Sequence, residues 1–263
     1  MVYVYKKLVK AGIYYHLYEY KTPVLVGYTE GCRKERVLHG SGKEFSHGRF
    51  DSSVYRTRRN VKFLVQSNVD CDFVPVFITF TFKEDITEIS IANGELSLFI
   101  KRLNYFVYGR NVRELKYIAV PEIQYKREKK FGKGVWHYHV IFFNLPYIVN
   151  IYDVLSSMWR NGYILVKSVN DEIRLINYIS KYFTKATHEK RLCGKKAYFG
   201  SRSLLKPTVF WSVASLPGTL EISTALALNT SLFSKVYGKG STEVKYSMYK
   251  IPVLPPVSEP GAS

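Results

Sequence analysis

Four segments in the middle of the chain have the hydrophobic pattern and β-branched composition of strands. Residues 76–82 (VFITFTF) are apolar, aromatic or threonine throughout, and strand-like segments follow at 117–123, 135–143 and 163–169. The segment 135–143 is apolar on both faces, which predicts a central strand. Pro121 predicts an edge or a bulge for the second segment, because proline donates no hydrogen bond to a neighbouring strand.

Helical patterns alternate with these strands. Asn93 can cap a first helix, and a shorter second helix is predicted to end at Asn161-Gly162. The order from 76 to 169 is β-α-β-β-α-β, so we predict an α+β fold with a ferredoxin-like core and an antiparallel sheet. A third helix, capped by Asn170 or Asp171, follows the core directly. The apolar positions of the first and third helices are Leu96, Phe99, Ile100, Leu103 and Phe106, and Ile176, Ile179 and Phe183.

The remaining segments suggest a division of the chain. Residues 1–70 are predicted to be a basic N-terminal extension, in which alternating pieces between 3 and 28 have the pattern of hairpin strands. Residues 71–210 are predicted to be the main domain and 211–250 a C-terminal extension. Residues 251–263 contain several prolines among small residues and are expected to form a disordered tail.

The charge of the chain narrows the class of its partner. Lys and Arg number 39 against 21 Asp and Glu, a formal net charge of +18, while a hydrophobic content of 46% is enough for a packed core. Such a charge favours a polyanion, most often nucleic acid, with a membrane surface as the other candidate. No amphipathic helix dominates the sequence and no apolar stretch is long enough to span a bilayer, so we expect nucleic acid and no membrane.

The cysteines and the N-terminus indicate a compartment. Cys32, Cys71 and Cys193 are odd in number and far apart, which predicts neither a disulfide framework nor a cysteine-based zinc site. The N-terminus lacks the uninterrupted apolar segment of a secretory signal. We therefore expect a cytoplasmic protein.

Two histidines lie inside the predicted central strand. His137 and His139 are two residues apart, so their side chains leave the strand on the same face. Imidazoles on an apolar face need polar partners or a ligand to offset their burial. Glu122, on the preceding strand, comes near both if the two strands pair as a hairpin. Two imidazoles and one carboxylate suit Mg²⁺ or Mn²⁺ bound partly through a substrate phosphate, and such a site can also hold zinc.

These three residues also have a simpler interpretation. A histidine pair at this spacing can arise by chance in a chain with 16% aromatic residues. Glu122 can be a surface carboxylate that balances the basic run at 126–133.

Two tyrosines one helical turn apart lie in the third predicted helix. Tyr178 and Tyr182 share one helical face, although in a chain with 22 tyrosines such a pair is most simply a packing pair. Lys181 and Lys185 each follow one of these tyrosines by three residues. A nearby ammonium stabilises a phenolate and can hold a phosphate, and a nucleophilic tyrosine needs both.

Taken together, the 77–82 strand, His137-Tyr138-His139 and Tyr178-Ile179-Ser180-Lys181-Tyr182 resemble three motifs of the rolling-circle replication initiators, which are HUH endonucleases. The Tyr-x-x-Lys-Tyr form is similar to the two-tyrosine initiators of single-stranded DNA phages and related plasmids. Their pattern includes a glutamate upstream of the histidines, matched by Glu122. It also includes a Ser-Arg pair near a later proline, matched loosely by Ser201, Arg202 and Pro207. The resemblance covers about residues 54–207.

The resemblance implies a metal-dependent endonuclease and strand transferase that initiates rolling-circle replication. His137, His139 and Glu122 would hold Mg²⁺ or Mn²⁺ at a phosphodiester of single-stranded origin DNA. Tyr178, with Lys181 beside it, would attack phosphorus, form a 5′-phosphotyrosine and free a 3′-OH that primes synthesis. Tyr182 would act in a second transfer that closes the displaced circle.

The same resemblance implies an HUH endonuclease domain at 71–210 and suggests partners. The candidates for DNA contact are Lys126, Arg127, Lys185 and Arg202. The sequence contains no P-loop, so a host helicase and a host polymerase are expected partners, in the cytoplasm of a bacterial host.

Two other functions stay open. A non-catalytic module that binds single-stranded nucleic acid can also be a basic ferredoxin-like sheet bearing aromatic residues. The Gly-flanked aromatic signature of RNA-recognition domains is missing from the candidate central strands, and such a module gives no reason for a histidine pair facing a tyrosine helix. A transposase of the same chemistry would share the site, although the length of the chain and the tyrosine pair favour replication.

Overall fold

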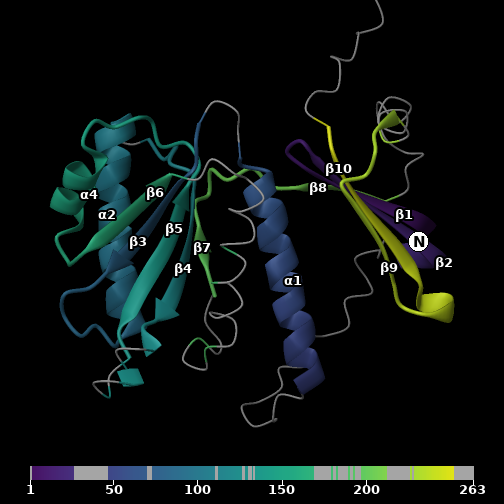
Figure 1. Ribbon diagram of the computed structural model, residues 1–263, viewed down its shortest axis with the longest axis horizontal. Helices are drawn as coiled ribbons and strands as arrows, with labels where there is room; N and C mark the ends of the chain where they lie inside the picture. Colours follow the sequence, from purple (N-terminus) through teal and green to yellow (C-terminus); the bar gives the residue numbers. More distant parts are fainter. Residues whose placement is uncertain are drawn as a thin grey trace, which may run out of the picture. The chain divides into compact units, whose positions relative to one another are not determined.

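The computed structural model (Figure 1) describes residues 2–26, 47–69, 73–109, 112–125, 128–129, 132, 134–168, 179, 182, 189, 192, 197–211, 226 and 228–251. The chain divides into two compact units, His47–Leu205 and a second one made of Met1–Ser46 with Lys206–Ser263. Each unit contains its own five-stranded antiparallel sheet.

The larger unit has the predicted α+β order. Its elements are α1 (His47–Gln66), β3 (Val76–Thr81), α2 (Ile89–Tyr108), β4 (Tyr117–Ile123), β5 (Trp136–Phe142), α4 (Ile151–Trp159), β6 (Ile164–Ser168) and β7 (Phe199–Gly200). From β3 to β6 they run β-α-β-β-α-β, and the sheet order is β6-β3-β5-β4-β7. The first four of these strands have the ferredoxin-like arrangement, with β7 added at one edge.

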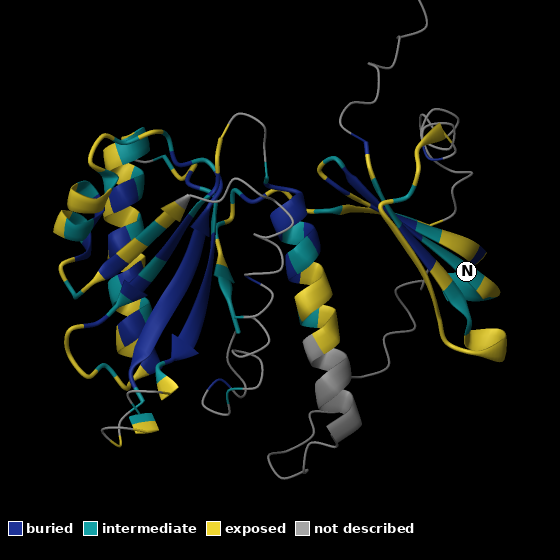
Figure 2. Ribbon diagram, viewed as in Figure 1, coloured by how far each residue is buried: buried dark blue, intermediate teal, exposed yellow. Residues whose placement is uncertain are grey.

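The predicted central strand is confirmed. β5 pairs with β3 on one side and β4 on the other, and all its residues are buried (Figure 2). The edge position predicted for Pro121 is also found, because β7 pairs only with Ile118 and Ala119. Beyond Ala119 the outer side of β4 has no strand partner among the described residues, so the missing N–H of Pro121 interrupts no ladder there.

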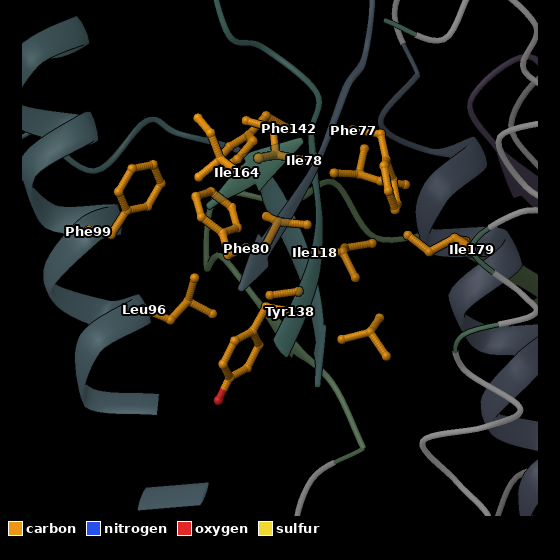
Figure 3. Close-up of a cluster of buried hydrophobic side chains, with 14 of the residues drawn as sticks. Phe77, Ile78, Phe80, Leu96, Phe99, Ile118, Tyr138, Phe142, Ile164 and Ile179 are labelled. Atoms are coloured by element: carbon orange, nitrogen blue, oxygen red, sulfur yellow. The ribbon is translucent and has the colours of Figure 1, made fainter. Parts of the chain in front are cut away.

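The two faces of this sheet pack against different parts of the unit. Phe80 points toward α2 and α4, with its ring centroid 4.6 Å from that of Phe99 and 5.0 Å from that of Trp159. Figure 3 shows Leu96 and Phe99 on this side of the sheet, and Phe77, Ile118 and Ile179 on the other. α1 lies on that other side (Figure 1) and contributes Val61 and Val65 to the core. The strands therefore have one helix-covered face and one face that carries the histidines.

One detail of the predicted first helix is wrong. α2 begins at Ile89 with Glu88 at the N-cap position, so Asn93 lies inside the helix. The Asn93 side chain has a different task, because its Oδ1 accepts a hydrogen bond of 2.6 Å from the hydroxyl of Tyr138. The end predicted for the short helix agrees with α4, which stops before Gly162. A Cβ at Gly162 would lie 2.4 Å from the carbonyl oxygen of Thr81, so only glycine fits this approach.

The smaller unit joins the two ends of the chain in one sheet. Its strands are β1 (Val2–Ala11), β2 (Tyr14–Val26), β8 (Thr208–Trp211), β9 (Phe233–Tyr237) and β10 (Val244–Lys250), in the order β8-β1-β2-β10-β9. The N-terminal hairpin was predicted, whereas its pairing with β8 and β10 was not. Leu8, Tyr15 and Leu17 form the core of this unit with Leu226 and Ile251.

Several predictions fall outside the described residues. They include most of the tyrosine helix, of which Ile179 and Tyr182 are described, and residues 252–263 of the predicted tail. In the part of the chain that is described, no helix is long and apolar enough to cross a membrane.

Candidate metal centre

The pairing of β4 with β5 brings the three predicted metal ligands together. Glu122 lies directly opposite His137 in the register of the two strands, and His139 follows on the same face of β5. The three side chains are buried, with exposed fractions of 5 to 8%. The strand periodicity therefore produces the cluster that the sequence predicted.

The ligand atoms of this cluster form a tight triangle. Oε2 of Glu122 lies 3.0 Å from Nε2 of His137 and 2.7 Å from Nε2 of His139, and the two Nε2 atoms are 2.9 Å apart. Hydrogen bonds alone satisfy this triangle poorly, because protons on both nitrogens would point at one oxygen and at each other. A cation between the three atoms would use all three lone pairs at once. The donor set therefore fits a divalent metal ion.

A threonine on the neighbouring strand supports one of the histidines. Oγ1 of Thr79 lies 3.1 Å from Nδ1 of His139, and Thr79 faces His139 in the register of β3 and β5. When Nδ1–H donates to this hydroxyl, the lone pair of Nε2 faces Glu122, which is the tautomer that a metal requires. Nδ1 of His137 is buried and has no hydrogen-bond partner among the described residues. Support of the two ligands is therefore unequal.

Replacing Thr79 with valine is expected to weaken Mn²⁺ binding by about 10- to 100-fold, because a partner that orients a metal ligand typically contributes that much. The measurement is an isothermal titration of the protein with Mn²⁺. Thr81→Val is the matched control, since Thr81 lies on the same strand and its hydroxyl donates to the carbonyl oxygen of Tyr163. Equal Mn²⁺ affinity in Thr79→Val and in the control would contradict the orienting role.

A tyrosine ring lies against the cluster. The ring of Tyr182 stacks on His139 with a centroid distance of 3.6 Å and an interplanar angle of 31°. Phe77 packs beside both rings, 5.6 Å from His139 and 6.1 Å from Tyr182. Ile179 is fully buried on the same side of the sheet (Figure 3). The predicted juxtaposition of a tyrosine segment and a histidine-bearing strand is thus present at these two positions.

The tyrosine between the two histidines has a different environment. Tyr138 leaves β5 on the opposite face, where it is buried and donates its hydroxyl proton to Asn93. Burial raises the pKa of its phenol well above the usual value. Tyr138 is therefore a core residue and is no candidate nucleophile.

The other predicted functional residues are distributed as follows. Arg202 is described and exposed, in the segment after β7. The remaining ones lie outside the described residues: Tyr178, Lys181, Lys185, Lys126 and Arg127. The structure adds Thr79 to the site. Its only signal in the sequence is its place in the 76–82 strand, which does not distinguish it from an ordinary strand threonine.

Comparison with known families gives one match. Residues 75–187 match a family of replication-associated proteins of the ORF2 type. The matched segment is less than half of the chain, and it contains Thr79, Glu122, His137, His139 and Tyr182. It supports a replication-associated protein and is consistent with a rolling-circle replication initiator. Comparisons with curated proteins and with solved structures gave no match.

Proposed function

We propose that this protein initiates rolling-circle replication as a metal-dependent endonuclease, which nicks single-stranded origin DNA and joins a tyrosine to the cut end. The observation that carries the proposal is the contact between Tyr182 and His139, at 3.6 Å between ring centroids, beside three converging metal donors. The family match over the same residues supports a role in replication. A non-catalytic binding module would have no use for these donors.

The residues of the cluster divide the work. Glu122, His137 and His139 would hold Mg²⁺ or Mn²⁺, with Thr79 keeping His139 in the correct tautomer. When bound, the cation would polarise the scissile phosphate and offset the charge that develops on its oxygens. Phe77 and His139 fix the ring of Tyr182 by stacking, which limits the orientations available to its phenol.

The proposed reaction conserves one phosphodiester bond. The phenol oxygen attacks phosphorus, a bond forms between them, and the bond from phosphorus to the 3′-oxygen breaks. The phenol loses a proton to solvent and the departing 3′-oxygen gains one, so the products are a 5′-phosphotyrosine and a free 3′-OH. Because no bond is lost to water, a second attack can rejoin the strand.

We assign the first attack to Tyr178 and the second to Tyr182, one helical turn apart in the sequence. Lys181 and Lys185, each three residues after a tyrosine, would stabilise the phenolate or hold the phosphate. Lys126, Arg127 and Arg202 are proposed to contact the DNA backbone, in keeping with the net charge of +18. A host helicase and polymerase are the proposed partners, in the host cytoplasm.

The proposal is tested with single-stranded oligonucleotides tiled across both strands of the DNA molecule that encodes the protein. Each is incubated with the protein and either Mn²⁺ or EDTA, and the products are separated under denaturing conditions. We expect one oligonucleotide to yield a cleaved fragment and a covalent protein–DNA band in Mn²⁺ alone. Binding to many oligonucleotides without any covalent band would instead indicate a single-strand-binding module.

A further inference from the structure

A cleft lies apart from the metal centre, near the start of β4. It has a volume of about 570 Å³, in the range of small-molecule sites. Its walls come from α2, from the connection between α2 and β4, and from the segment after β7. Tyr117, at the first position of β4, also lines it. Glu122 lies five positions further along this strand, which corresponds to about 17 Å.

Three cations surround the cleft. Lys101 is on α2, Arg113 on the connection and Arg202 on the segment after β7, and all three side chains are exposed. Within the described part of the chain, none of the three makes an ion pair with a carboxylate. Glu114, next to Arg113 in sequence, is not among the lining residues. Three positive side chains that converge on one concavity favour an anionic ligand.

Short polar networks hold two of these cations in place. The side chain of Asn104 donates to the carbonyl oxygen of Val112 and accepts a hydrogen bond of 3.2 Å from the N–H of Leu115, so it brackets Arg113. Ser201, which precedes Arg202, bonds to Tyr117 in both directions. The cleft is thus built from segments that are tied to a rigid helix and a rigid strand.

An aromatic ring accompanies the cations. Tyr105 lies one helical turn after Lys101 on α2 and is 52% exposed, and both residues line the cleft. Rings on which bases stack, combined with cations that hold the backbone, are the usual elements of single-strand recognition. A free phosphate would need the cations alone, whereas a nucleotide in a strand would use both.

We propose that this cleft binds a nucleotide of the single-stranded DNA substrate, with its base against Tyr105 and neighbouring phosphates on Lys101, Arg113 and Arg202. The inference rests on the proposed function, because it takes the DNA to be single-stranded. The separation along β4 places this nucleotide several positions from the scissile phosphate. The cleft would therefore fix the register of the strand at the metal centre without touching the reacting atoms.

The test is equilibrium binding of a fluorescent oligothymidylate of about 20 nucleotides, followed by anisotropy in EDTA, so that neither metal nor cleavage is required. Tyr105→Ala is expected to lower the affinity by about 5- to 150-fold, the range typical of one base–aromatic stack. The double variant Lys101→Ala/Arg113→Ala is expected to reduce the slope of log affinity against log salt by about 1.4, the value for two phosphates on a single strand.

Matched controls are available on the same unit. Tyr147→Ala removes a tyrosine that is 91% exposed and lies outside the cleft, and Lys167→Ala removes an exposed cation on β6. All these side chains are at the surface, and thermal melting verifies that each variant is folded. Affinity and salt slope that stay at the control values in both cleft variants would overturn the inference.

Two further results separate this inference from the proposed function. Thymidine monophosphate that competes as strongly as the oligonucleotide would make the cleft a free-nucleotide site and would overturn the inference. Loss of binding in the cleft variants supports it even if no covalent adduct forms in Mn²⁺, in which case the nickase proposal alone fails.

Discussion

Replacing His139 with alanine is expected to slow covalent adduct formation by on the order of 10³-fold or more, because it removes a metal donor together with the stacking surface of Tyr182. Glu122 would keep one imidazole partner in a buried position, 3.0 Å away at His137. The measurement is the rate at which the denaturation-resistant protein–DNA band appears in saturating Mn²⁺.

The metal itself has an independent readout in this variant. Wild-type protein should melt at a higher temperature in Mn²⁺, because a ligand that binds only the folded state stabilises it, by about 2.7 kcal/mol at a hundred times the dissociation constant. That shift should vanish in His139→Ala. Glu114→Gln is the control, since Glu114 is an exposed carboxylate outside the cluster. A wild-type shift and rate in His139→Ala would contradict the metal centre.

Replacing Tyr178 with phenylalanine is expected to abolish the first covalent adduct, with a loss on the order of 10³-fold or more, because no other group in the proposal supplies the attacking oxygen. Tyr182→Phe should keep the first adduct and lose the second transfer. Phenylalanine preserves the ring that stacks on His139 and Phe77, so the loss is chemical rather than structural. The measurement uses a DNA strand with two nicking sites and follows both the adduct and the joined product.

The control for the tyrosines is Tyr152→Phe, which changes a partly exposed phenol on α4 that lies outside the cluster. An adduct that persists in Tyr178→Phe and disappears in Tyr182→Phe would reverse the assignment of the two tyrosines. An adduct in the double variant would exclude both as nucleophiles.

The sequence predicted those features that depend on local periodicity. The β-α-β-β-α-β order follows from alternating patterns within about a hundred residues, and the convergence of Glu122, His137 and His139 follows from a two-residue spacing and one hairpin. The helix start at Asn93 was wrong because a capping residue type gives no register by itself, and α2 begins at Ile89.

The features that the sequence did not predict depend on distant contacts. Thr79 supports His139 across a strand pair separated by 60 residues, and the cleft combines Lys101, Arg113 and Arg202 from three segments. The pairing of β2 with β10 spans more than two hundred residues and has no local signal. Such arrangements are set by packing of the whole unit, which a single sequence does not display.

The most direct test of the central claim is the polarity of the covalent adduct. The cleavable oligonucleotide is labelled at its 5′ end in one sample and at its 3′ end in another, and each is incubated with wild-type protein in Mn²⁺ or EDTA. The account predicts that the 3′ label travels with the protein in Mn²⁺ only, and that the 5′-labelled fragment is released with a 3′-OH that a polymerase can extend. A protein-bound 5′ label, or an adduct of either kind in EDTA, would contradict a metal-dependent nickase that forms a 5′-phosphotyrosine.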